Sequence, residues 1–260
     1  MNYDGYIFDL DGTLYMGDAL LPGARDLLHD LRERSKRVLF LSNNPTRTRQ
    51  QYAEKLTKLG IAADANEVLN SSAVLVRRLS EIAPGAMLFV VGEAPLIGEL
   101  EEAGFTLSEE PGAIEWVVAS FDRTFSYHKL QVAFDAVRAG ARLIATNADR
   151  YCPVPGGGQP DAAAVIAAIE ACTGAQCQEV AGKPSALMAR AALDQLGLPA
   201  QRCLMTGDRL ETDILMGQRA GIDTAFVLTG ASTRADLATL ERQPTYVLEG
   251  VGELLHMLRQ

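Results

Sequence analysis

Short runs of apolar, β-branched or aromatic residues alternate along this chain with longer segments in which apolar residues recur every three or four positions. The first kind of run is typical of a buried strand, and the second is typical of a helix with one buried face. Their alternation predicts repeated βα units, and therefore an α/β fold with a doubly wound, Rossmann-like parallel sheet. The predicted strands cover 6–8, 37–41, 88–91, 116–120, 143–145, 203–205 and 224–227, and the predicted helices cover 24–34, 47–59, 71–82, 94–103, 127–139, 161–172 and 212–220.

Two breaks interrupt this pattern. Pro84 and Gly85 stop a predicted helix, and the stretch 153–160 is rich in proline and glycine. With 260 residues, the chain has room for a core and a second, smaller unit. We therefore expect two units.

Composition and charge exclude several classes of function. The chain is 48% hydrophobic and carries a formal net charge of -9, so we expect no nucleic-acid binding, which requires concentrated lysine and arginine. We also expect no signal peptide and no membrane anchor, because no run reaches the roughly 18 apolar residues that a spanning helix needs. The four cysteines show neither zinc-site nor disulfide spacing, which favours a cytoplasmic location.

The clearest chemical signal is a pair of carboxylates, Asp9 and Asp11, in the stretch Asp-Leu-Asp-Gly-Thr directly after the first predicted strand. Open parallel sheets bind their ligands at this carboxyl edge. One carboxylate at such an edge can attack a substrate while the other moves protons. A simple turn also uses Asp and Gly, but a hydrophobic strand that runs directly into this stretch favours a catalytic site.

Two further stretches lie where a phosphate would bind. Ser42 and Asn43 follow the second predicted strand and offer a hydroxyl and backbone N–H groups, although Ser-Asn-Asn is also ordinary turn chemistry. Lys183, in Gly-Lys-Pro, precedes an apolar helical segment and offers a cation, unless it is only a solvated surface lysine.

An acidic cluster follows the strand predicted at 203–205, in the stretch Gly-Asp-Arg-Leu-Glu-Thr-Asp. Asp213 can offset the dipole of the following helix, whereas Asp208 has no such structural role. Carboxylate oxygens from Asp9 and Asp208 with a backbone carbonyl are ligands that Mg²⁺ accepts in its octahedral shell. The sequence therefore predicts a Mg²⁺ site.

These four stretches, in this order and each at a strand end or a helix start, resemble the motifs of the haloacid dehalogenase-like hydrolase superfamily over nearly the whole chain. The resemblance implies a phosphoric monoester hydrolase in which Asp9 is the nucleophile and a Mg²⁺ ligand. It implies that Asp11 is the general acid and base, and that its main-chain carbonyl also binds the metal.

The same resemblance implies roles for the other motif residues. Ser42 and Lys183, with Asn43 beside them, would bind the phosphoryl group. Asp208 would bind the metal, and Asp213 would support Lys183 and the metal's water shell.

The spacing of the motifs locates the second unit. The stretch between Asp11 and Ser42 has room for only one helix and one strand, whereas the stretch from Ser42 to Lys183 is far longer than a few βα crossovers need. This spacing is similar to that of subfamily IIA, which includes the NagD-like, 4-nitrophenyl phosphate, phosphoglycolate and pyridoxal phosphate phosphatases and carries an inserted α/β cap of the C2 type. We expect the core at 1–83 and 179–260 and the cap at 84–178.

A cap of this kind would contact the leaving group, so its loops would select the substrate. The candidates for specificity are Tyr151, Cys152 and Pro153, although an ordinary surface loop has the same composition. The expected partner is a small phosphorylated metabolite of unidentified structure. The oligomeric state is open, and a homodimer formed through the cap is one alternative.

Three alternatives share the fold. A dehalogenase would need neither Asp11 nor Asp208, and a phosphomutase would carry its cap between the first two motifs. A catalytically silent phosphate-binding regulator would be expected to have lost a catalytic group, and none is missing.

Overall fold

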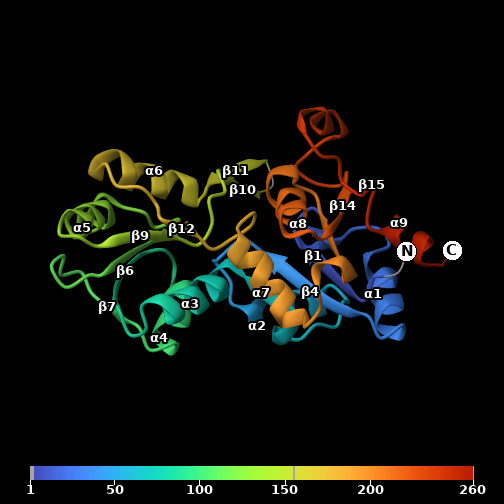
Figure 1. The fold of residues 1–260 in the computed structure, drawn as a ribbon, viewed down its shortest axis with the longest axis horizontal. Coiled ribbons are helices and arrows are strands. Elements are labelled where there is room, and N and C mark those ends of the chain that lie inside the picture. The colour runs from blue at the N-terminus through green and yellow to red at the C-terminus, as the bar shows by residue number, and fades with distance from the viewer. Residues whose placement is uncertain (1–2, 155, 260) are drawn as a thin grey trace. The chain divides into compact units, whose positions relative to one another are not determined.

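The computed structural model describes residues 3–154 and 156–259 and confirms the predicted α/β fold with an inserted second α/β unit. The chain divides into two compact units (Figure 1). The first contains the residues up to Ser42, Arg49–Leu69 and the residues from Lys183 onward, and the second contains Asn43–Thr48 and Asn70–Gly182. The segment 70–83, which the sequence assigned to the core, lies in the second unit because its helix packs against the next helix of that unit.

A six-stranded parallel sheet forms the centre of the first unit, and its strands follow the order β15-β14-β13-β1-β4-β5. The six strands are β1 (Gly5–Asp9), β4 (Arg37–Ser42), β5 (Val68–Asn70), β13 (Cys203–Gly207), β14 (Asp223–Val227) and β15 (Tyr246–Leu248). Strand β1 is fully buried and lies between β13 and β4, so its carboxyl end is in the middle of the sheet edge.

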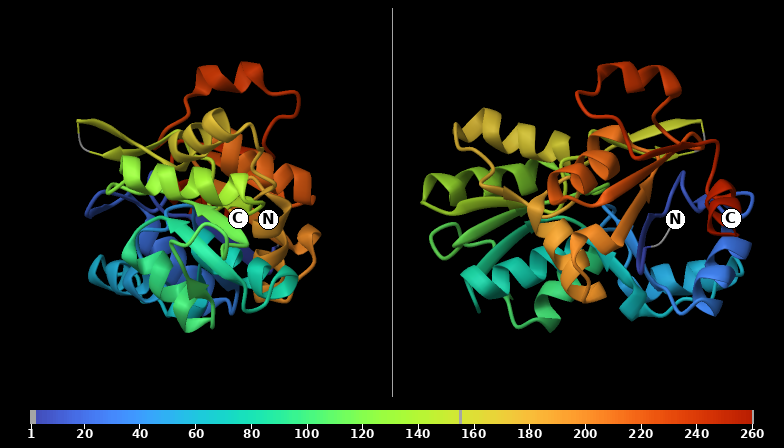
Figure 2. Two further views of the ribbon diagram at one scale, coloured as in Figure 1. Left: turned by 90° about the vertical axis from the view of Figure 1, so that its left-hand side faces the viewer. Right: turned by 45° about the vertical axis from the view of Figure 1, so that its right-hand side comes forward.

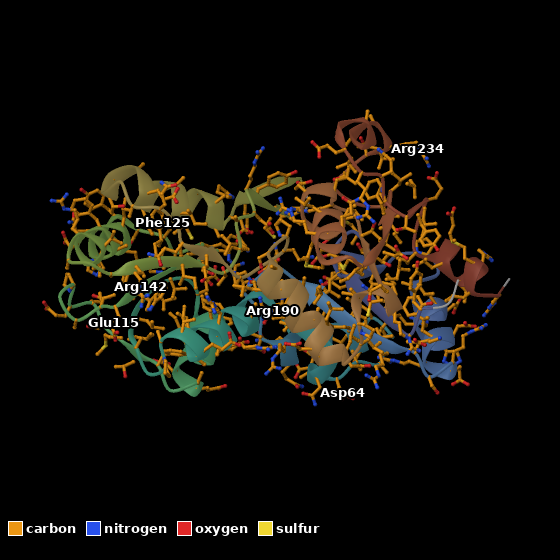
Figure 3. All side chains as sticks on the ribbon, viewed as in Figure 1. Asp64, Glu115, Phe125, Arg142, Arg190 and Arg234 are labelled. Carbon is orange, nitrogen blue, oxygen red and sulfur yellow. The ribbon has the colours of Figure 1, made fainter. Side chains whose placement is uncertain are left out.

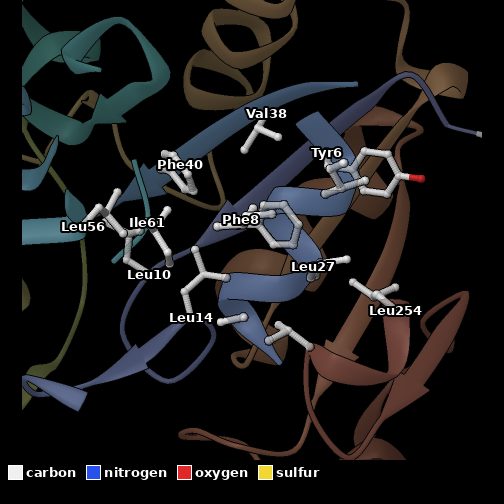
Figure 4. Close-up of a cluster of buried hydrophobic side chains, with 14 of the residues drawn as sticks. Tyr6, Phe8, Leu10, Leu14, Leu27, Val38, Phe40, Leu56, Ile61 and Leu254 are labelled. Atoms are coloured by element: carbon white, nitrogen blue, oxygen red, sulfur yellow. The ribbon is translucent and has the colours of Figure 1, made fainter. Parts of the chain in front are cut away.

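Helices cover both faces of this sheet. They are α1 (Ala24–Glu33), α2 (Arg49–Lys58), α7 (Ala186–Leu196), α8 (Leu215–Ala220) and α9 (Gly252–Arg259). The unit also contains short helical turns at Ala65–Glu67, Ala200–Arg202, Leu210–Ile214 and Arg234–Thr239. A small hairpin consists of β2 (Tyr15–Met16) and β3 (Ala19–Leu20). Alternate residues of β1, Tyr6 and Phe8, point to one face and pack with Leu27 of α1, Leu56 of α2 and Leu254 of α9 (Figure 4). This packing fixes the position of β1 in the first unit.

The second unit contains a five-stranded parallel sheet in the order β12-β9-β8-β6-β7. Its elements are α3 (Ser71–Ile82), β6 (Met87–Val91), α4 (Ala94–Glu102), β7 (Thr106–Leu107), β8 (Trp116–Ala119), α5 (Tyr127–Arg138), β9 (Arg142–Ala145), α6 (Ala162–Thr173) and β12 (Glu179–Val180). Helices α5 and α6 cover one face of this sheet, and α3 and α4 cover the other (Figure 2). Arg142, labelled in Figure 3, lies over the ring of buried Trp116 on the neighbouring strand, with its guanidinium carbon 4.0 Å from the ring centroid.

Most predicted elements are confirmed to within two residues at either end, and the differences are local. The proline- and glycine-rich stretch forms a hairpin of β10 (Tyr151–Val154) and β11 (Gly157–Pro160). The helix predicted at 212–220 begins instead with a π-helical turn at Leu210–Ile214. Strands of two or three residues were not predicted because they contain too few alternating positions to give a pattern. Within 3–154 and 156–259, no helix combines the length and the apolar character that crossing a membrane requires.

Candidate active site

Three predicted site residues meet at one edge of the first unit's sheet because they end neighbouring parallel strands. Asp9 is the last residue of β1, Ser42 is the last residue of β4, and Asp208 directly follows β13. The strand registers align these ends, since Asp9 pairs with Leu41 and Phe8 pairs with Thr206. The side chains of Asp9, Ser42 and Asp208 are all buried at this edge.

Lys183 is brought to the same edge from the entrance to α7. Ser185 caps this helix by accepting a hydrogen bond from the backbone N–H of Met188, so the chain turns into the helix just after the lysine. The Lys183 side chain is only 3% exposed, and its Nζ lies 2.5 Å from Asp9 Oδ1 and 2.7 Å from Asp213 Oδ1. Burial alone would lower the pKa of Lys183, but the charges of Asp213 and Asp9 raise it above its ordinary value. Lys183 is therefore a buried, permanently charged cation and not a surface lysine.

Asp208 and Asp213 face this cation from the segment after β13. The π-helical turn places Asp213 back over the end of that strand, where its Oδ2 accepts the backbone N–H of Arg209 at 3.1 Å. Asp208 Oδ2 accepts the backbone N–H of Ala231 at 2.6 Å. Burial, and then the charges of Asp9 and Asp213, raises the pKa of Asp208 to about 8. Burial also raises the pKa of Asp213, although Lys183 opposes this change.

The three carboxylates fit a divalent metal ion. One oxygen from each of Asp9, Asp208 and Asp213 can be chosen so that all three lie within 4.8 Å of one another, and all three residues are buried. Two glycines allow the backbone to lie close to these carboxylates. A Cβ at Gly207 would lie 2.3 Å from Asp213 Cβ, and a Cβ at Gly230 would lie 1.9 Å from Asp208 Oδ2. Buried like charges with oxygen ligands favour a hard cation, which stabilises their ionised form.

The remaining core-motif residues lie as follows. Asp11 is exposed, and its side chain does not belong to the carboxylate cluster found among the described residues. Ser42 donates its hydroxyl hydrogen to Tyr52 Oη at 3.0 Å. Asn43 follows Ser42 but belongs to the second unit, where its Nδ2 donates to the carboxylate of Asp149 at 3.1 and 3.2 Å.

The candidates for substrate specificity lie on the hairpin of the second unit. Tyr151, Cys152 and Pro153 belong to β10, and Tyr151 is 49% exposed. Within this unit Asn44 Nδ2 lies 3.6 Å from Cys152 Sγ, which places the hairpin next to the turn that contains Asn43 and Asn44. Their role in substrate selection stays a prediction.

Sequence reasoning missed the loop that follows β14. Within it Thr229 donates its hydroxyl hydrogen to the carbonyl of Gly12 at 2.6 Å, and the backbone N–H of Ser232 donates to the carbonyl of Asp208 at 3.1 Å. A usable signal was present, because the strand predicted at 224–227 ends at the same sheet edge and leads into Thr-Gly-Ala-Ser.

We expect the substitution Lys183→Met to destabilise the metal-free protein by about 3 to 5 kcal/mol, because it leaves buried carboxylates without their cation. Methionine keeps the length and the apolar stem of the side chain. Urea denaturation in the presence of EDTA measures the free energy of unfolding, and the exposed Lys58→Met variant is the control. An equal, small change in both variants would contradict a stabilising role for the contacts of Lys183 with Asp9 and Asp213.

The chain is similar to known proteins over nearly its whole length. A profile of haloacid dehalogenase-like hydrolases matches residues 6–106, and a second profile, described as HAD-hydrolase-like, matches 180–254. The sugar-phosphatase AraL of Bacillus subtilis is 38% identical over 256 residues, which cover 98% of this chain and 93% of that protein.

Solved structures extend the similarity to the whole fold. A 4-nitrophenylphosphatase from Thermotoga maritima superposes with a TM-score of 0.93 at 36% identity, covering 98% of this chain and 97% of that one. NagD from Escherichia coli K-12 superposes with a TM-score of 0.90 at 31% identity, covering 97% and 98%. The predicted resemblance is confirmed: the chain belongs to the haloacid dehalogenase-like hydrolase family, in the subfamily IIA group of NagD and the 4-nitrophenylphosphatases.

Proposed function

We propose that this chain hydrolyses small-molecule phosphomonoesters in a Mg²⁺-dependent reaction through a covalent phosphate on Asp9. The observation that carries the proposal is the position of Lys183 Nζ, 2.5 Å from Asp9 and 2.7 Å from Asp213, beside the clustered carboxylates. A carboxylate nucleophile needs such cations to approach an anionic phosphate. At the level of reaction class, the chain is a phosphoric monoester hydrolase, as its full-length phosphatase relatives are.

The proposed Mg²⁺ ligands are the carboxylates of Asp9 and Asp208 and the main-chain carbonyl of Asp11. Asp213 supports the site through Lys183. The bound ion would offset the negative charge between the nucleophile and the phosphate. The oxygen-only ligand set and the contacts that Gly207 and Gly230 permit support this assignment.

The proposed reaction has two steps. An oxygen of Asp9 attacks phosphorus, the bond to the substrate alcohol breaks, and protonated Asp11 gives its proton to the leaving oxygen. Asp11 then takes a proton from a water molecule, whose oxygen attacks the phosphorus of the aspartyl phosphate. The bond between the Asp9 oxygen and phosphorus breaks, which frees the Asp9 carboxylate and releases inorganic phosphate. Lys183 and Ser42, with Asn43 beside Ser42, bind the phosphoryl oxygens. The exposure of Asp11 supports its role, because a proton donor must reach a leaving group outside the buried carboxylates.

Sugar phosphates are the proposed substrate class, on the basis of the full-length relative named a sugar-phosphatase. The stretch 84–178, which makes up most of the second unit, is proposed as the cap that selects the leaving group. Tyr151, Cys152 and Pro153 are its proposed contacts. A homodimer through the cap and a cytoplasmic location stay predictions.

We expect phosphate release from 4-nitrophenyl phosphate and from members of a sugar phosphate panel in the presence of Mg²⁺, and none in excess EDTA. A malachite green assay for free phosphate measures this, and phosphoglycolate and pyridoxal phosphate serve as comparison substrates. The ranking of kcat/KM over the panel tests the substrate class. Absence of release from every compound, with Mg²⁺ present and the protein folded, would contradict the phosphatase and favour a silent phosphate-binding protein.

A further inference from the structure

The loop after β14, residues 229–232, lies at the sheet edge that carries the carboxylates. Strand β14 is the parallel neighbour of β13, and Gly207 at the end of β13 pairs with Phe226. The loop therefore starts one strand away from Asp208. We call residues 229–232, Thr-Gly-Ala-Ser, the β14 loop.

The β14 loop holds Asp208 through both its side chain and its backbone. The N–H of Ala231 donates to Asp208 Oδ2 at 2.6 Å, and the N–H of Ser232 donates to the Asp208 carbonyl at 3.1 Å. Ser232 Oγ also accepts the N–H of Leu210 at 3.1 Å. These bonds fix the carboxylate from one side, while Thr13 Oγ1 contacts Asp208 Oδ1 at 3.4 Å from another.

The same loop connects Asp208 to the segment that follows Asp9. Thr229 Oγ1 donates to the Gly12 carbonyl at 2.6 Å, across 217 positions of sequence. Gly12 itself adopts a φ of 86° and approaches Asp208 so closely that a Cβ there would lie 2.7 Å from Asp208 Oδ2. The β14 loop thus joins the two segments that supply the proposed metal ligands.

Gly230 is required by proximity and not by backbone conformation. Its φ lies outside the left-handed range, so a left-handed backbone is not the reason for glycine at this position. A Cβ at this position would nevertheless lie 1.9 Å from Asp208 Oδ2, 2.3 Å from its Cγ and 2.5 Å from its Cβ. Alanine at 230 would therefore displace the Asp208 carboxylate.

We propose that the β14 loop is a positioning element for the metal ligand Asp208, in which Gly230 permits the close approach and the Ala231 N–H sets the carboxylate orientation. The inference rests on the proposed metal-dependent function. Groups that orient a metal ligand without touching the metal affect affinity strongly, and their loss typically weakens binding by about 10- to 100-fold.

The test is the Mg²⁺ dissociation constant of the Gly230→Ala variant, measured by calorimetric titration of Mg²⁺ into the EDTA-treated and dialysed protein. We expect a dissociation constant roughly 10- to 100-fold above that of the unmodified chain. Turnover of 4-nitrophenyl phosphate should recover as Mg²⁺ is raised, because the ligand is displaced and not removed. In Asp208→Ala the ligand is missing, so raised Mg²⁺ should not restore turnover.

Two glycine variants are matched controls. Gly98→Ala adds a Cβ in open space on α4, and Gly217→Ala places a Cβ 2.5 Å from Thr224 Cγ2 within the fold. The first should change neither stability nor affinity adversely, and the second should lower stability while Mg²⁺ affinity stays unchanged. If Gly230→Ala does not fold, Thr229→Val removes the hydrogen bond to Gly12 without adding a heavy atom, and should weaken Mg²⁺ binding several-fold.

The outcomes separate this inference from the proposed function. Unchanged Mg²⁺ affinity in folded Gly230→Ala, or in Thr229→Val where that variant is needed, would overturn the positioning role while leaving the phosphatase intact. An equal loss of affinity in Gly217→Ala would also overturn it, since the effect would then be general destabilisation. Absence of Mg²⁺ binding by the unmodified chain would overturn both the metal-dependent function and the inference.

Discussion

The substitution Asp9→Asn should reduce turnover of phosphomonoesters on the order of 10⁴-fold or more, with little change in the fold. An amide has the shape of the carboxylate but is not a nucleophile, so the covalent step cannot start. Asp9 ends a rigid buried strand, and Asp213 still faces Lys183, so the packing should persist. Steady-state kinetics gives the rate, and circular dichroism checks the fold. Asp11→Asn should also abolish turnover.

The matched control for this prediction is Asp18→Asn, which changes an exposed aspartate outside the carboxylate cluster. It should keep the kcat of the unmodified protein. Sensitivity to hydroxylamine provides a second measurement, because this reagent cleaves an aspartyl phosphate. After an acid quench, the unmodified chain should carry labelled phosphate that hydroxylamine releases, and Asp9→Asn should carry none. Full activity in Asp9→Asn would contradict the proposed mechanism.

Removal of the divalent metal should abolish activity and make stability depend on pH. In the metal-free protein the pKa of Asp208 is raised from 3.8 to about 8, so the folded state holds this proton more tightly than the unfolded state does. A raised pKa in the folded state contributes stability that is present below pH 4 or so and is lost as the pH rises toward about 8. The raised pKa of Asp213 acts in the same direction.

Mg²⁺ should oppose this loss, because it binds the ionised carboxylates and competes with their protons. At about 100 times its dissociation constant, Mg²⁺ adds about 2.7 kcal/mol to the free energy of unfolding, which corresponds to roughly 5 to 10 °C in Tm. Thermal unfolding from about pH 5 to about pH 9, with Mg²⁺ and with EDTA, measures the effect. We expect the Mg²⁺-induced shift to grow with pH. A shift as large at pH 5 as at pH 8, in the same buffers, would show that the carboxylate cluster is not the metal site.

Local pattern predicted most of the regular structure. The helix expected at 71–82 is α3 (Ser71–Ile82), and the strand expected at 116–120 is β8 (Trp116–Ala119). Such segments are long or apolar enough for their periodicity to indicate both type and position. The π-helical turn at Leu210–Ile214 was not predicted, because its hydrogen bonds depend on how the chain leaves β13 and not on a repeating pattern.

The candidate site was predictable to the extent that it lies at strand ends. Asp9, Ser42 and Asp208 each follow a recognisable buried strand, and parallel strands bring their carboxyl ends to one edge. The position of Asp213 in the carboxylate cluster, where it faces Lys183 at 2.7 Å, is decided by the π-helical turn. The close approach of Gly230 to Asp208 is decided by the packing of the β14 loop.

The α/β class, the order of the main strands and helices, and the motif residues at the sheet edge were all predictable from the sequence. These depend on interactions within a few positions along the chain, which leave a readable period or a characteristic stretch. Which of these groups touch one another depends on the tertiary fold. Lys183 meets Asp9 across 174 positions, and Thr229 meets Gly12 across 217. Such contacts are set by the packing of the whole sheet, so no pattern in the local sequence predicts them.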